Sequence, residues 1–153
     1  MLDSFKRIIG LGSAQDRLKD VAMEEQVAVC AILLEVAEAD NHFADEEREE
    51  ILRGLQNYFG LSKAAVATLM MTAEKERQNT ADMWEFTNSI SRSYSPDQKL
   101  NLLTMVWQVI LADGVLDPHE EHLARRFQTM LSVNHSVLME AKQKAREVME
   151  ARG

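Results

Sequence analysis

Residues 39–47 read ADNHFADEE and residues 112–120 read ADGVLDPHE, so one kind of acidic loop occurs twice in the chain. Both begin with Ala-Asp and both carry a second aspartate and a glutamate further on. In each copy an apolar segment precedes the loop and an amphipathic segment follows it. Each loop is therefore expected to end one helix and to begin another.

The flanking segments repeat as well. Leu33 falls opposite Val106 at an offset of 73, and Ile51 falls opposite Leu123 at an offset of 72, so the first loop is one residue longer. The pattern predicts two three-helix repeats, near residues 29–76 and 102–148. Two units are too few for an open solenoid. We expect them to close on each other around one core with approximate two-fold symmetry.

Helical periodicity dominates the chain, and strand patterns are nearly absent. The composition, with 46% hydrophobic and 27% charged residues and only two prolines, is typical of a helical globular protein. At 153 residues the chain has the length of one domain. We predict an all-α fold of about seven to eight helices, with an amphipathic segment at 1–15 and a single domain at 16–153.

A net charge of −8 argues against a nucleic-acid partner, because phosphate binding needs a basic surface. An acidic surface suits cations or a basic protein partner instead. Cys30 is the only cysteine, so no internal disulfide can form, and it lies in an apolar helical stretch where burial is expected. These features indicate a cytoplasmic protein.

Residues 1–12 combine apolar residues, among them Leu2, Phe5, Ile8 and Ile9, with Lys6 and Arg7. The stretch is too short for a signal peptide or a transmembrane helix, and no transmembrane segment is expected elsewhere. Two interpretations stay open: peripheral contact with a membrane surface, or a first helix that packs on the domain.

Several helix boundaries can be predicted from local signals. Gly60 has the position of a helix C′ residue, Ser62 that of a cap, and Ser95-Pro96 that of a cap followed by proline at N1. A connecting helix is expected over about residues 81–91. The two tryptophans, Trp84 and Trp107, are predicted to lie in the core.

The acidic loops have two interpretations. Asp45 and Asp117 are explained as helix caps. Asp40 and Asp113 are less expected, because each lies at a helix C-terminus, where the helix dipole disfavours an anion. They either hold the corner through an Asx-turn or converge with their neighbours on a divalent cation through oxygen ligands. The candidate metal ligands are Asp40, Asp45, Glu47, Asp113, Asp117 and Glu120.

Known site patterns do not account for these residues. The EF-hand template fails, since Pro118 and Ala124 stand where a loop counted from Asp113 requires glycine and glutamate. His119 and His122 are three residues apart rather than four, which excludes the zinc-protease motif and favours solvated side chains. No catalytic set and no phosphate-binding loop is recognisable, so no enzymatic activity is expected.

The pattern Ala-Asp-Gly-x-Leu-x-x-x-Glu at 112–120, with its looser copy at 39–47, resembles the TerB-like tellurite-resistance family. The segments 82–87 and 103–107 are similar to an uncharacterised bacterial branch of that family. The resemblance implies an all-helical, pseudo-symmetric domain of about seven helices, associated with tellurite and other chemical stress. It also implies divalent-metal binding by the acidic loops and no established catalysis. The ligands it implies are Asp40, Glu47, Asp113 and Glu120, although Asn41 replaces the glycine of the motif in the first copy.

Two functions therefore follow as expectations. The first is a non-enzymatic stress-response module that binds a divalent cation (Ca²⁺, Mg²⁺, Mn²⁺ or Zn²⁺) at the two acidic corners. The alternative is a helical interaction module whose acidic loops are purely structural. That module would dock a protein through its acidic face or a membrane through residues 1–12.

Overall fold

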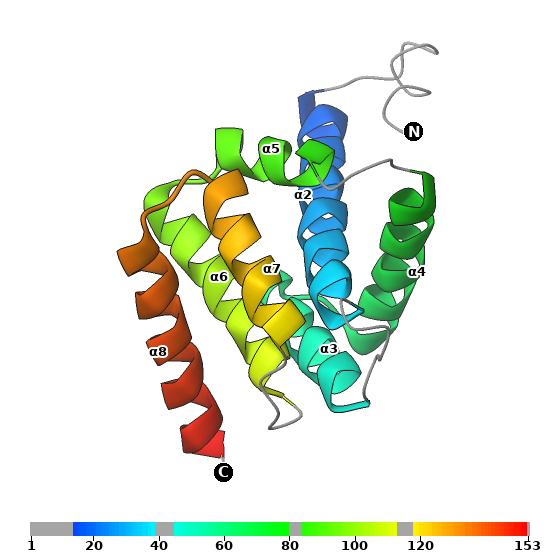
Figure 1. Cartoon of the computed structure of the whole chain (residues 1–153). Coiled ribbons are helices and arrows are strands. Elements are labelled where there is room, and N and C mark those ends of the chain that lie inside the picture. The colour runs from blue at the N-terminus through cyan, green and yellow to red at the C-terminus, as the bar shows by residue number, and fades with distance from the viewer. Residues whose placement is uncertain (1–13, 39–44, 80–83, 113–117, 153) are drawn as a thin grey trace.

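A computed structural model describes residues 14–38, 45–79, 84–112 and 118–152, and this part of the chain contains seven helices and no strand (Figure 1). The all-α prediction is confirmed. Residues 1–12, Asp40, Asp113 and Asp117 lie outside the described residues. The helices are α2 (Ala14–Ala37), α3 (Asp45–Phe59), α4 (Lys63–Asn79), α5 (Trp84–Ser93), α6 (Pro96–Leu111), α7 (Pro118–Met130) and α8 (His135–Arg152).

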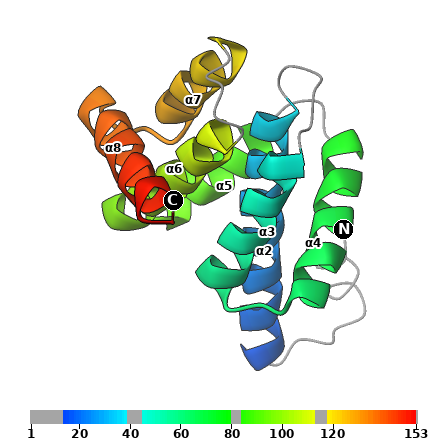
Figure 2. The same ribbon diagram turned by 90° about the horizontal axis from the view of Figure 1, so that it is seen from below.

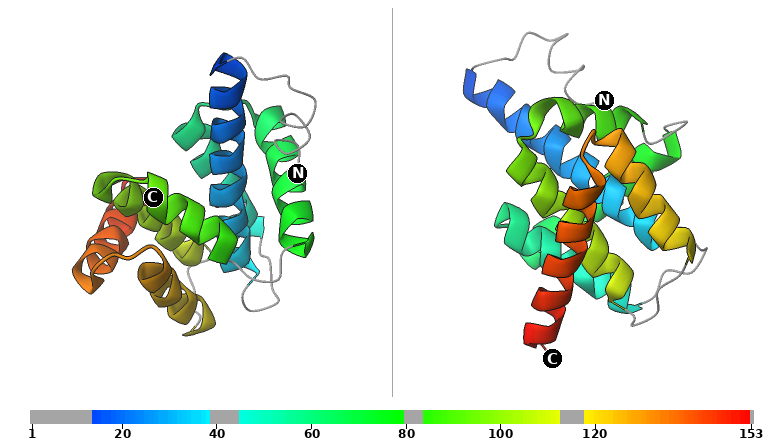
Figure 3. Two further views of the ribbon diagram at one scale, coloured as in Figure 1. Left: turned by 90° about the horizontal axis from the view of Figure 1, so that it is seen from above. Right: turned by 60° about the vertical axis from the view of Figure 1, so that its left-hand side comes forward.

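The helices form two groups around the contact between α2 and α6. Helix α2 packs against α3 and α4, while α6 packs against α7 and α8. Figure 2 shows the first group on one side and the second on the other, and Figure 3 shows α8 on the side away from α4. Helix α5 connects the groups in sequence and packs on α2 and α7. This pairing parallels the sequence repeat, while the two-fold relation itself stays a prediction.

The core is centred on α2 and α6, the two most apolar helices. Residues 28–34, 36 and 37 of α2 are all buried, so neighbours cover this helix on nearly every side. Helix α6 contributes seven buried residues, among them Trp107 with 0% exposure. The repeat-related positions Leu33 and Val106 are both fully buried. The apolar segments before the two loops therefore do form the centre of the fold.

The helix ends confirm most of the local predictions. Ser62 accepts a hydrogen bond from the backbone N–H of Ala65 at 3.1 Å, as an N-cap does. Ser95 and Gln98 form a reciprocal capping box, and Pro96 occupies the first turn of α6. After α3, the Leu61 N–H donates to the Gln56 carbonyl at 3.1 Å. Short-range chemistry thus determines where these helices begin and end.

Gly60 adopts φ +66°, the left-handed conformation that suits glycine at a helix C′ position. Replacing Gly60 by alanine should lower the free energy of unfolding by about 1–2 kcal/mol from backbone strain alone, since no atom lies within 4 Å of the added Cβ. Gly54 is the matched control within α3. Its alanine variant should gain about 0.5–1 kcal/mol of helix stability, because the nearest atom to its Cβ, Met105 Cε, is at an acceptable 3.4 Å. Urea titration of both variants measures the contrast, and equal effects would contradict it.

One tryptophan prediction is wrong. Trp84 is 57% exposed, whereas Trp107 is buried as expected. The buried face of α5 is made by Phe86, Thr87 and Ile90, and the first residue of the helix falls to one side of that face. On α8, Val148 is 37% exposed and lies beyond the last buried position of the helix, Ala145.

A chain of three polar side chains ties the first repeat to the turn before α6. The Tyr58 hydroxyl donates to the Tyr94 hydroxyl at 3.1 Å, and Tyr94 donates to Glu25 Oε1 on α2 at 2.5 Å. Burial, together with donation to Glu25, raises the pKa of Tyr94 above its ordinary value. Tyr94 therefore stays protonated and keeps donating across the neutral pH range.

Candidate functional site

The first acidic corner lies between the end of α2 at Ala37 and the start of α3 at Asp45. Asp45, Glu46 and Glu47 form the first turn of α3, where carboxylates complement the positive end of the helix dipole. Asp45 and Glu46 are exposed, as solvated first-turn residues usually are. Asp45 is itself the first residue of α3, and its predicted role as the cap stays a prediction.

Glu47 differs from its two neighbours, because its side chain is only 1% exposed. A carboxylate is almost never buried to this extent unless hydrogen bonds, a cation or protonation compensates for lost hydration. The burial places an acidic group on the core side of the first turn of α3. Among the predicted ligands whose side chains are described, Glu47 is buried and Asp45 is exposed.

The second corner lies between the end of α6 at Leu111 and the start of α7 at Pro118. Helix α7 begins with proline, as expected at N1. Asp113 and Asp117 lie outside the described residues, and so does the side chain of Glu120. His119 and His122 are exposed, which confirms the prediction that these histidines face solvent.

The described residues do not bring three His, Cys, Asp or Glu side chains together as a metal-binding group. Asp45 and Glu47 are the only predicted ligands whose side chains are described, and one is exposed while the other is buried. Asp40, Asp113 and Asp117 lie outside the described residues, and so does the side chain of Glu120. A cation site at either corner therefore stays a prediction.

Sequence reasoning missed a second buried carboxylate. Glu50 of α3 is 4% exposed, and both of its oxygens accept from Arg152 Nη1 of α8 at 2.7 Å. Arg53 adds a contact at 3.2 Å, and the Gln108 amide of α6 donates to Glu50 at 3.4 Å. Three helices thus meet at this carboxylate. It is fully engaged by protein groups and is not a candidate ligand.

Arg77 forms a further cluster that was not predicted. Its side chain, 13% exposed, contacts Glu35 of α2 and Glu38 just after α2 at 2.8 Å each, and Glu74 of its own helix α4 at 2.7 Å. The three carboxylates are about one-third exposed. Partial exposure weakens each pair, but one arginine shared by two helices fixes their relative position near the first corner.

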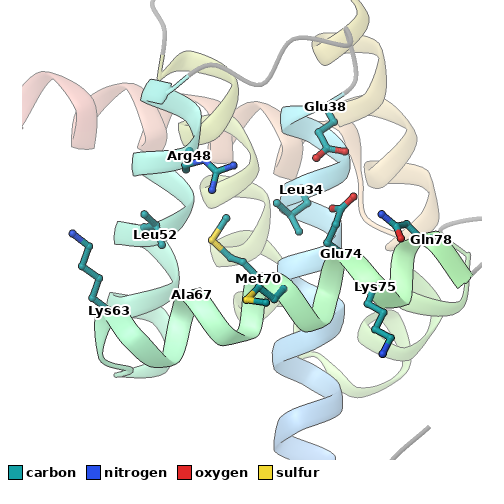
Figure 4. Close-up of a pocket in the computed structure, with 11 residues that line it drawn as sticks. Leu34, Glu38, Arg48, Leu52, Lys63, Ala67, Met70, Glu74, Lys75 and Gln78 are labelled. Atoms are coloured by element: carbon teal, nitrogen blue, oxygen red, sulfur yellow. The ribbon is translucent and has the colours of Figure 1, made fainter.

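A groove of about 670 Å³ lies beside this cluster, between α3 and α4 and over α2 (Figure 4). Its apolar lining includes Leu34, Leu52 and Met70, one from each of the three helices. The volume falls within the range of small-molecule sites. This groove could not be predicted from the sequence, because its lining residues are spread over three helices.

The comparisons with known proteins agree with this fold. Residues 26–143, more than half of the chain, match the family described as tellurite resistance protein TerB, and the chain therefore belongs to the TerB family. The crystal structure of a protein of unknown function from Porphyromonas gingivalis is similar, with a TM-score of 0.64 and 18% sequence identity. That match covers 82% of this chain and 95% of the other. None of the curated proteins matches.

The family and the structural likeness establish the fold and the kind of domain. Among the described helices, none has both the length and the apolar character required to cross a bilayer. Neither comparison identifies a bound cation, its ligands or a partner protein.

Proposed function

We propose that this TerB-family domain is a non-enzymatic module that binds a divalent cation at its acidic corners as part of a chemical-stress response. The observation that carries the proposal is the burial of Glu47 at 1% exposure, beside two exposed acidic neighbours in the same helical turn. A hard cation such as Ca²⁺, Mg²⁺ or Mn²⁺ prefers oxygen ligands, and Zn²⁺ also accepts carboxylates.

In the first corner, Glu47 would supply a buried oxygen ligand and Asp45 an exposed one, with Asp40 completing the set. In the second, Asp113, Asp117 and Glu120 would do the same. The role in stress response rests on the description of the family as tellurite resistance proteins. The cation would add a positive charge at the head of α3 and offset the desolvation of Glu47.

Titration of the metal-stripped protein with Ca²⁺, Mg²⁺, Mn²⁺ and Zn²⁺ should show saturable binding in calorimetry. Glu47→Gln should weaken the binding by about tenfold or more, since it removes a charged oxygen ligand. Glu46→Gln removes the same charge from the adjacent exposed position and should leave affinity within about twofold, because only screened long-range attraction is lost. This pair separates coordination from overall acidity.

The second corner is tested in the same experiment by Asp113→Asn and Asp40→Asn. If both corners bind, each single variant should halve the stoichiometry, and the double variant should abolish binding. No saturable heat with any of the four ions, or equal affinities of the Glu46 and Glu47 variants, would sink the proposal. The acidic loops would then be structural corners, and the domain would be better explained as a helical interaction module.

A further inference from the structure

The hairpin formed by α3 and α4 has a surface with almost no charge. Residues 54–73 contain a single charged residue, Lys63, although 27% of the whole chain is charged. The exposed positions of α4 in this stretch carry small or apolar side chains, namely Ala64, Ala65, Ala67, Thr68 and Met71. Met71, the one large side chain among them, is 76% exposed. An exposed and uncharged helix face is typical of an interaction surface in a soluble protein.

The threonine hydroxyls on this side of α4 are already paired within the helix. The Thr68 hydroxyl donates to the Ala64 carbonyl at 3.2 Å, and the Thr72 hydroxyl donates to the Thr68 carbonyl at 3.1 Å. Neither hydroxyl therefore needs a partner from outside the helix. Covering the face removes apolar surface from water and leaves these groups satisfied.

The side of α4 that lines the groove is complementary in shape to a second copy of itself. Four of its residues, Lys63, Ala67, Met71 and Glu74, line the groove and so lie along one side of the helix. Two copies of one helix can pack antiparallel about a two-fold axis, so that each contact occurs twice. The register that sets Lys63 opposite Glu74 of the second copy also sets Ala67 within one residue of the second copy's Met71. A large exposed side chain then meets a small one on both sides of the axis.

The two ends of this side also differ in charge. Lys63 is the first residue of α4, where the helix dipole is positive too. At the other end the carboxylates outnumber the cationic groups by one, with Glu35, Glu38, Glu74 and Glu76 against Arg48, Lys75 and Arg77. The Glu74 side chain is 37% exposed despite its contact with Arg77. In Figure 4 it projects to the same side of α4 as Lys63, whereas Lys75 projects to the opposite side.

We propose that the hairpin of α3 and α4 is a dimer interface, in which α4 packs antiparallel against α4 of a second copy of this chain. Met71 of each copy enters the groove of the other beside Ala67, and Lys63 pairs with Glu74 at both ends of the contact. The contact is two-fold symmetric and closes on itself, so it produces a dimer and not a longer assembly. It uses none of the candidate metal ligands and requires no cation.

Sedimentation equilibrium of the full chain over a range of concentrations tests the dimer. We expect a reversible equilibrium between monomer and dimer. Met71→Glu should weaken the dimer by about a hundredfold, because it places a carboxylate in the apolar groove of the second copy. The variant should fold normally, since Met71 is exposed in the monomer. Met139→Glu makes the same change at an exposed position of α8 and should leave the dissociation constant unchanged.

The charge pair is tested by a second matched pair of variants. Lys63→Glu should weaken the dimer by about tenfold, because it sets two carboxylates opposite each other at both ends of the contact. The same change favours α4 itself, since a carboxylate at the start of a helix complements the dipole. A weaker dimer therefore does not reflect a loss of fold. Lys144→Glu, at an exposed position of α8, is the control.

A crosslink identifies the face that forms the dimer. Thr68 lies midway between Lys63 and Glu74, nearest the expected two-fold axis, and Thr68→Cys should form a disulfide-linked dimer about tenfold faster than the exposed control Ser136→Cys. The native Cys30 is buried and does not compete. A wild type that stays monomeric at about 1 mM, an undiminished dimer of the Met71 variant, or equal crosslinking at both cysteines would each overturn the proposal. A monomeric wild type would leave this face to a different protein.

Discussion

Arg152→Ala is expected to lower the free energy of unfolding by about 2 kcal/mol, a large effect for the last residue of a terminal helix. Arg152 donates to both oxygens of Glu50 at 2.7 Å, and Glu50 is only 4% exposed. Removing the arginine leaves a carboxylate inside the protein with weaker partners. The full penalty of about 3–5 kcal/mol for a broken buried pair is reduced here. Arg152 is itself 32% exposed, and Arg53 still contacts Glu50.

The mechanism predicts an asymmetry between the two partners. Glu50→Gln should cost less than Arg152→Ala, because the freed arginine can extend into solvent whereas the buried carboxylate cannot. Adding Glu50→Gln to the Arg152 variant should then restore part of the lost stability. Arg146→Ala, at an exposed position of the same helix, controls for the loss of a positive charge on α8. Guanidinium denaturation of the four variants measures their free energies of unfolding. Losses that simply add in the double variant would contradict the buried-charge explanation.

The contact between Glu50 and Arg152 could not be predicted from the sequence. Arg152 lies 102 residues from Glu50, and both residues occur in charged helical segments where a solvated side chain is the ordinary expectation. Only the packing of α8 on α6, beside α3, brings them together. The caps at Ser62 and Ser95 were predictable because partner and cap are three residues apart.

The candidate site likewise has features that local sequence predicts and features that depend on helix packing. The repeat of the acidic loops is visible in the sequence, and so is the family that it indicates. The burial of Glu47 was not predicted, because Glu46 and Glu47 have similar local chemistry at the head of α3, although the apolar stripe of that helix carries a signal for it. Which of the two turns inward depends on the helix rotation that the stripe of Ile51 and Leu55 imposes. Glu47 lies four residues before Ile51 and so falls on the same face.

An effect on stability of comparable size is expected from Cys30, in the core of α2. The thiol has 0% exposure, and burial, with a smaller contribution from Glu74, raises its pKa from 9.0 to about 12, while Arg77 acts in the opposite direction. In the folded protein at pH 8 the thiolate should be about a thousandfold rarer than in an unfolded chain. Alkylation by iodoacetamide should therefore be negligible under native conditions and should follow the rate of opening.

The raised pKa also makes stability depend on pH in a defined direction. Between about pH 9 and pH 12 the folded thiol keeps its proton, whereas the unfolded thiol loses it. Ionisation therefore stabilises the unfolded state relative to the folded state as the pH rises. The contribution is fully present below pH 9 and declines above it. Wild type should lose about 1 kcal/mol of unfolding free energy per pH unit from this group between pH 9 and 11.

Cys30→Ala isolates that contribution. Tyr58 and Tyr94 also have raised pKa values and destabilise the fold at high pH by the same reasoning, but both remain in the variant. The difference in unfolding free energy between wild type and Cys30→Ala should be constant from pH 7 to 8.5. Above pH 9 it should move steadily in favour of the variant. Urea titrations at pH 8, 9, 10 and 10.5 measure the difference, and a constant offset across the series would show that Cys30 ionises as readily in the folded core as in the unfolded chain.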